Sequence, residues 1–235
     1  MLTWLAFALS AASSPDPVGD FNSGMAAERR GDLSAAAAWL DRAQRLAPRW
    51  ALPKLELAEV LLAEGGAPDR AMALLGDVQL LESQNPRFYH LRGLALMEKG
   101  NPALAEASER AALSLRPEFP EARQALGEAL WAGGKRDEAL QVWRELSARQ
   151  PHDTALRAML VDRLLDDGRG PEAEAELRIL LVAQPKNPIW HRRLARTLDA
   201  EGRGLEAAAE RDKAEALAGG PVKKRKLRRL PDSKR

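Results

Sequence analysis

Three histidines are the side chains of this 235-residue chain best suited to catalysis or metal binding. They are His90, His152 and His191, and no two of them stand four residues apart, the spacing at which a helix presents two metal ligands on one face. The chain has no cysteine, which excludes a thiolate nucleophile, a thiolate metal site and a disulfide. It also lacks a glycine-rich phosphate loop and a nucleophile-elbow serine. The sequence therefore predicts a protein that is not an enzyme and uses no metal, cofactor or small-molecule substrate.

A second feature with chemical potential is the basic C-terminus. Residues 221–235 contain eight basic residues and one acid, so they carry +7, whereas the whole chain carries +2 and the remainder therefore −5. The residues expected to contact an anionic surface are Lys223, Lys224, Arg225, Lys226, Arg228 and Arg229. Such a run can neutralise phosphates of nucleic acid or lipid, and without aromatic residues for base stacking its binding would be non-specific. Residues 219–235 are expected to form a disordered tail in either case, and the alternative is that this tail only adds solubility.

The rest of the chain consists of a repeat with a period of about 34 residues. One small residue and one turn glycine recur in each unit. The alanines are Ala36, Ala71, Ala105, Ala139, Ala173 and Ala207, and the glycines are Gly31, Gly65, Gly100, Gly134, Gly168 and Gly202. The alanine lets two helices approach closely, and the glycine supplies the positive φ that ends a helix. Together with leucines spaced three and four apart, this period indicates a stack of amphipathic helix pairs.

Six pairs of helices are expected from the spacing of these signals. The second pair has an extra residue in its turn, Gly65-Gly66-Ala67-Pro68, which leaves its register open by one residue. The last helix is rich in charge and alanine, as an end cap requires. The expected helices lie near residues 18–30 and 33–46, 52–64 and 68–82, 87–99 and 102–115, 120–132 and 136–149, 154–167 and 170–183, and 188–201 and 204–218.

This repeat resembles the tetratricopeptide repeat (TPR) family, whose pattern is Trp-x2-Leu-Gly-x2-Tyr, then Ala-x3-Phe, then Pro. In the fourth unit these positions hold Arg123, Leu126, Gly127, Leu130, Ala139, Trp143 and Pro151. The resemblance implies an all-α, right-handed solenoid of about six helix-turn-helix units over residues 15–218. The expected units are 17–50, 51–85, 86–119, 120–153, 154–187 and 188–218.

The resemblance also implies a concave groove, lined by the first helix of each unit, that binds a peptide or protein segment. Carried over to this sequence, its lining includes Phe21, Met25, His90, Leu94, Glu121, Gln124, Glu128, Trp131, Asp162, Arg192 and Arg196. The groove should be apolar at its start, acidic in its middle and basic at its far end, so that it attracts charges of the opposite sign. Each charge could instead belong to a solvated helix face. The clamp for C-terminal carboxylates known in this family is absent, because Phe21 and Met25 stand in place of its first two residues.

Residues 1–14 form a possible signal peptide, with an apolar run from Leu2 to Ala12 and small residues at the cleavage positions. No Lys or Arg precedes the run, and it is too short to span a bilayer. A leading helix or a mis-assigned start are the alternatives. Cleavage would place the protein in the periplasm or at the cell envelope, and an intact N-terminus would place it in the cytoplasm.

Two functions are compatible with these features. The first is a non-catalytic scaffold that binds a protein partner, whose identity the sequence does not reveal, in the groove. The alternative is a cytoplasmic factor that docks on nucleic acid or another anionic surface through its basic tail.

Overall fold

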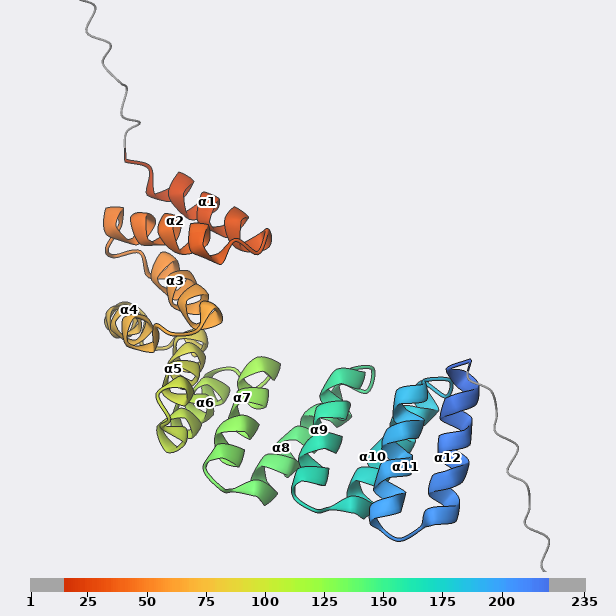
Figure 1. Cartoon of the computed structure of the whole chain (residues 1–235). Helices are drawn as coiled ribbons and strands as arrows, with labels where there is room; N and C mark the ends of the chain where they lie inside the picture. Colours follow the sequence, from red (N-terminus) through yellow and green to blue (C-terminus); the bar gives the residue numbers. More distant parts are fainter. Residues whose placement is uncertain (1–14, 220–235) are drawn as a thin grey trace, which may run out of the picture. The chain divides into compact units, whose positions relative to one another are not determined.

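The computed structural model describes residues 15–219 and contains twelve α-helices and no strand in that range (Figure 1). Each helix lies within one residue of its expected ends. Residues 1–14 and 220–235, to which the signal peptide and nearly all of the basic tail were assigned, lie outside the described residues. The helices are α1 (Pro17–Arg29), α2 (Leu33–Leu46), α3 (Ala51–Glu64), α4 (Pro68–Leu81), α5 (Pro86–Glu98), α6 (Pro102–Leu115), α7 (Pro120–Ala132), α8 (Arg136–Arg149), α9 (Thr154–Asp166), α10 (Gly170–Ala183), α11 (Pro188–Ala200) and α12 (Gly204–Leu217).

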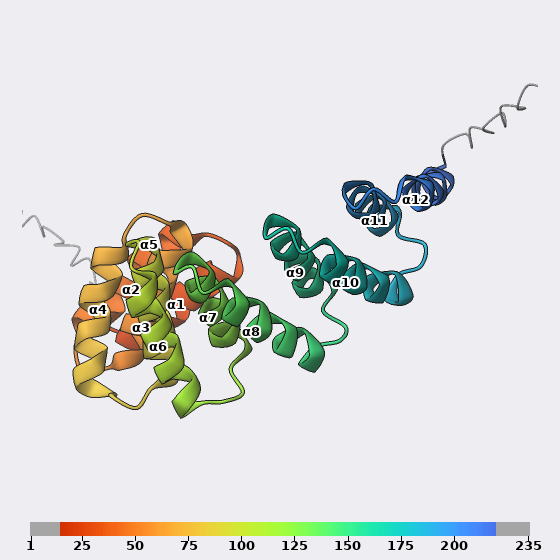
Figure 2. The same cartoon turned by 90° about the horizontal axis from the view of Figure 1, so that it is seen from below.

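The chain divides into two compact units between Ala139 and Leu140, within α8. In the first unit, each helix from α1 to α7 packs on the next one along the chain (Figure 2). In the second unit, α9, α10, α11 and α12 pack successively in the same way. The second helices α2, α4, α6 and α10 are thereby each covered by the first helix of their own repeat and by the first helix of the next repeat. Within residues 15–219, no helix is long and apolar enough to cross a membrane.

The helix starts and ends follow local rules. Aspartate caps open several helices: Asp32 accepts a hydrogen bond from the backbone N–H of Ala35 at 3.0 Å, and Asp153 does so from Leu156 at 2.9 Å. The six turn glycines all have positive φ, between 69° and 80°, as their position after a first helix predicts. The extra residue of the second repeat is absorbed in its turn, because Gly65 and Gly66 both have positive φ.

The repeated alanines lie in the core of the helix pairs. All six are fully buried, with no exposed surface. The first helix also approaches closely, because a Cβ on Gly24 of α1 would lie 2.7 Å from Leu40 Cγ of α2. The last helix differs from its predecessors. Where α10 buries Leu177, the equivalent residue of α12 is the exposed Arg211, so α12 has the polar outer face expected of an end cap.

Candidate functional site

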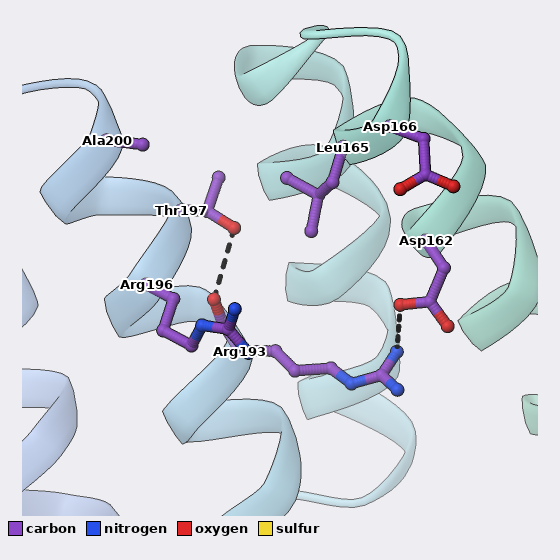
Figure 3. Close-up of a pocket in the computed structure, with 7 residues that line it drawn as sticks. All are labelled: Asp162, Leu165, Asp166, Arg193, Arg196, Thr197 and Ala200. Atoms are coloured by element: carbon purple, nitrogen blue, oxygen red, sulfur yellow. Dashed lines mark hydrogen bonds and ion pairs between the residues drawn. The ribbon is translucent and has the colours of Figure 1, made fainter.

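The candidate site is a pocket of about 450 Å³ in the second unit, between α9 and α11 (Figure 3). These are the first helices of consecutive repeats, and Asp162 and Arg196 hold the same repeat position 34 residues apart, so both face the same side of the stack. The pocket is lined by Asp162, Leu165, Asp166, Arg193, Arg196, Thr197 and Ala200.

The floor of the pocket is apolar and partly accessible. Leu165 of α9 is 37% exposed, and Ala200, the last residue of α11, is exposed. Thr197 is buried, and its hydroxyl donates to the backbone carbonyl of Arg193 at 3.1 Å (Figure 3). An apolar side chain of a bound molecule would therefore contact Leu165 and Ala200 and lose its water there.

One end of the pocket is closed by an ion pair between the two helices. Arg193 Nη1 of α11 donates to Asp162 Oδ1 of α9 at 2.7 Å (Figure 3). The Arg193 guanidinium also lies 5.5 Å from the ring centre of Trp190, which helps to fix its position. Because both charged side chains are partly exposed, the pair contributes only about 0–1 kcal/mol to stability. Its main effect is to neutralise Asp162.

Two charged residues of the pocket remain available. Asp166 and Arg196 are exposed, and neither has an ion-pair or hydrogen-bond partner among residues 15–219. Asp166 is the last residue of α9, where the helix dipole adds negative potential. The α9 wall of the pocket therefore attracts a cation, and the α11 wall attracts an anion.

The remaining predicted groove residues of the second unit include Arg192, which lies outside this pocket. It lines a second pocket of about 340 Å³, between α11 and α12, together with Arg211 and Glu215. Of the predicted residues of this unit, the structure thus brings Asp162 and Arg196 together and places Arg192 elsewhere.

The apolar groove residues predicted at the start of the chain are partly committed to packing. Phe21, Met25 and Leu94 are half-buried and contact the core of the first unit. The ring of Phe21 lies 4.9 Å from that of Trp50. Only part of the apolar surface of each of these side chains is therefore accessible to a bound segment.

His90 makes a contact within its own repeat. Its Nδ1 lies 3.0 Å from Oε2 of Glu109, a residue of α6 that is 1% exposed, and its ring meets Phe119 edge-on at 5.0 Å. Burial raises the pKa of the Glu109 carboxyl, although the hydrogen bond from His90 acts in the opposite direction. His90 therefore compensates a buried carboxylate that stands where the TPR pattern has phenylalanine.

On α7, the predicted residues Glu121, Gln124 and Glu128 are exposed and Trp131 is half-buried. They belong to the first unit, whereas Asp162 belongs to the second. The three acids predicted for the middle of the groove are thus divided between two units, and each unit must be considered as a separate surface.

Sequence reasoning missed Asp166 and Arg193, which lie outside the groove positions of the family. A signal for Arg193 exists, because an acid and a base stand 31 residues apart on consecutive first helices. The same spacing recurs in the first unit, where Arg87 Nη1 donates to Glu56 Oε1 at 2.6 Å. Hydrogen bonding to Glu56 raises the pKa of Arg87, so this arginine is charged at any physiological pH.

The other residues considered for chemistry are not gathered into a site. His152 is exposed in a turn, and His191 contacts Glu210 within the last repeat. Residues 15–219 contain no group of three histidine, aspartate or glutamate side chains placed to hold a metal ion. The six basic residues predicted to contact an anionic surface, Lys223, Lys224, Arg225, Lys226, Arg228 and Arg229, lie outside the described residues.

Comparison with known proteins agrees with this architecture. One tetratricopeptide repeat model matches residues 96–163 and 130–197, and another matches residues 6–49. A search of curated proteins finds no match.

Several solved TPR structures have a similar fold. The type IV pilus biogenesis factor PilW has a TM-score of 0.70 at 16% identity, covering 87% of this chain and 94% of its own. A tetratricopeptide repeat protein from Parabacteroides merdae gives 0.64 at 18% identity, with coverages of 88% and 81%. YrrB, a TPR protein with an unusual peptide-binding site, gives 0.59 at 19% identity, with coverages of 77% and 92%. At these identities the likeness concerns the fold alone. From its repeats, its helix pairs and these matches, the chain belongs to the tetratricopeptide repeat family.

Proposed function

We propose that this protein is a non-catalytic scaffold that binds a segment of a partner protein in the pocket between α9 and α11. The observation that carries the proposal is the combination of an accessible apolar floor with two unpaired charges, Asp166 and Arg196. The TPR fold supports a role in protein interaction, and YrrB is a structural relative named for a peptide-binding site.

The lining of the pocket favours a protein segment over a small molecule. Four of its seven lining residues are charged, whereas small-molecule sites are lined mainly by apolar and aromatic side chains. A small apolar centre with a charged rim is instead typical of a protein interface. Affinity would come from one apolar anchor on the floor, and specificity from the charges around it.

His90 and His191 support a scaffold in a different way, because both serve helix packing. His191 Nδ1 lies 2.6 Å from Glu210 Oε2, and its Nε2 lies 3.1 Å from the carbonyl oxygen of Pro185. These contacts link α11 to α12 and to the preceding turn. His90 and Glu109 link α5 to α6 in the same manner.

The proposal is tested by filling the pocket. Peptides selected on the immobilised full chain from a random dodecapeptide phage library provide the ligands, and Ala200→Trp blocks the floor. The matched control is Ala209→Trp, which adds the same side chain at an exposed alanine of α12 outside the pocket. We expect Ala200→Trp to weaken peptide binding at least about tenfold and Ala209→Trp to leave it unchanged, with equal helix content by circular dichroism. Equal binding by both variants would show that the pocket is not the site.

A further inference from the structure

We infer that the segment bound between α9 and α11 carries one acidic and one basic side chain, on either side of an apolar one. This inference rests on the proposed function and adds the chemistry of the partner to it. The supporting observation is that the two walls of the pocket have opposite charge (Figure 3).

The charges of the pocket fall into a paired set and an unpaired set. Asp162 and Arg193 neutralise each other across the pocket at 2.7 Å. Asp166 on α9 and Arg196 on α11 have no partner among the described residues. The pocket as a whole is therefore neutral, yet it offers one free carboxylate and one free guanidinium on opposite helices.

A segment of a single charge sign fits this arrangement poorly. An acidic segment would find Arg196, but it would also approach Asp166 and the negative end of the α9 dipole. A basic segment would find Asp166, but it would also approach Arg196 and the exposed Arg192 one turn earlier on α11. Because like charges placed together at an interface cost free energy, each wall rejects the segment that the other attracts. A segment with both signs satisfies both walls.

The floor sets the spacing of the two charges. Leu165 and Ala200 form the accessible apolar surface of the pocket, so an apolar side chain of the ligand belongs between the charged ones. In an extended segment only alternate side chains face the same side, and they lie about 7 Å apart. We therefore expect a Leu, Ile, Val or Met that faces the floor, with an acidic residue two positions to one side of it and a basic residue two positions to the other.

The experiment uses the peptides selected on the full chain and a double-mutant cycle. Arg196→Gln and Asp166→Asn each remove one wall charge, and each peptide is also made with its acidic or its basic residue changed to glutamine. We expect each protein variant to bind the unchanged peptide about tenfold more weakly than the wild type does. Arg196→Gln should lose no further affinity when the acidic residue of the peptide is neutralised, and Asp166→Asn should lose none when the basic residue is neutralised. Lys186→Gln and Asp212→Asn are the matched controls, because they change the net charge equally at exposed residues outside the pocket; both should bind as the wild type does.

The outcomes separate this inference from the proposed function. Some peptides could bind Ala200→Trp weakly and yet carry charges of one sign only, or bind Arg196→Gln and Asp166→Asn as well as the wild type. That result would overturn the inference of a segment with both charges and would leave the pocket as the binding site. Peptides that bind Ala200→Trp normally, or a selection that yields no binding peptide, overturn the proposed function and this inference together.

Discussion

Lys135, in the turn before α8, donates from Nζ to the carboxylate of Glu106 on α6 at 2.9 Å. The same relationship recurs two repeats later, where Arg203 binds Glu174 of α10. In both places an arginine one turn further along the helix also binds the carboxylate, Arg110 in the first case and Arg178 in the second. The fourth and the sixth repeat are thus each joined to the preceding repeat by a basic residue at the turn, on the side of the second helices.

Acid should weaken the link between α10 and the turn before α12. The hydrogen bond from Arg203 holds the pKa of Glu174 below its ordinary value of 4.5, and Arg178 acts in the same direction. Because the folded-state pKa is the lower one, the stabilisation is complete above pH 4.5 and is lost as the pH falls through the folded value. We expect the urea midpoint of Glu174→Gln to fall less steeply with acid than that of the wild type. Glu215→Gln, at an exposed residue of α12, should follow the wild type.

The buried Glu109 should produce the opposite pH dependence. Burial raises its pKa above 4.5 in the folded protein, so the folded state binds this proton more tightly than the unfolded state does. The resulting stabilisation is present below pH 4.5 and is lost as the pH rises through the raised value. The free energy of unfolding of the wild type should therefore decline relative to that of Glu109→Gln as the pH rises from about 4 to about 6. A constant difference across this range would contradict the prediction.

Enlarging a repeat alanine should destabilise the protein. Ala105 has no exposed surface, so the added atoms of Ala105→Leu must displace neighbouring side chains and the facing helix. We expect a loss of about 1–3 kcal/mol in the free energy of unfolding, measured with urea. The control is Ala107→Leu on the exposed side of the same helix, which should change stability by less than about 0.5 kcal/mol. If Ala105→Leu and Ala107→Leu changed the free energy of unfolding equally, the helix crossing at Ala105 would have space for a larger side chain.

Two glycine substitutions should have opposite effects. Gly100 has a φ of +70°, and Gly76 lies within α4; a Cβ at either position would meet no atom within 4 Å. Gly100→Ala should therefore cost about 1–2 kcal/mol through backbone strain alone. Gly76→Ala should add about 0.5–1 kcal/mol, because alanine restricts the unfolded chain and favours the helix. Thermal unfolding of the two variants measures both changes. If the melting temperature shifted in the same direction in both variants, the prediction of opposite effects would be wrong.

The predicted contact of the basic C-terminus with anionic surfaces can be tested by removing its charge. Removing residues 221–235 removes a net charge of +7 and leaves a chain of −5. If this segment contacts anionic surfaces, the full chain should bind a heparin column in low salt and the truncated chain should flow through. A version with these residues in scrambled order should bind as well as the wild type, because the contact depends on charge and not on sequence. Equal elution of the full and truncated chains would leave the segment without this role.

Most of the fold could be predicted because its rules are local and repeated. Ala105, Gly100 and their equivalents recur at a constant spacing, and each imposes a condition on its own helix pair. The ends of the helices follow from caps such as Asp32 and Asp153, which act within one turn. Over the described residues the register therefore follows from the period, except in the second repeat, where the extra residue left it open by one and the structure places that residue in the turn.

The site was harder to predict from the sequence than the fold, because its contacts depend on side chains that reach between helices. Arg193 binds Asp162 at a spacing of 31 residues, which the repeat period does not mark. His90 faces Glu109 because a carboxylate fills a position where the family has an aromatic ring, and a buried charge needs a partner. Family positions identify which helix faces the groove, but not which of its charged residues are already paired.

The paired glycines between α3 and α4 have a practical consequence. Gly65 and Gly66 take up an added residue while the helices on both sides keep their alignment, and a Cβ at either glycine would meet no atom within 4 Å. A short epitope or a fluorescent label spliced between them would therefore protrude into solvent without disturbing the neighbouring helices. This turn offers a place to attach a reporter in the first unit, while the α9–α11 pocket of the second unit is left unmodified.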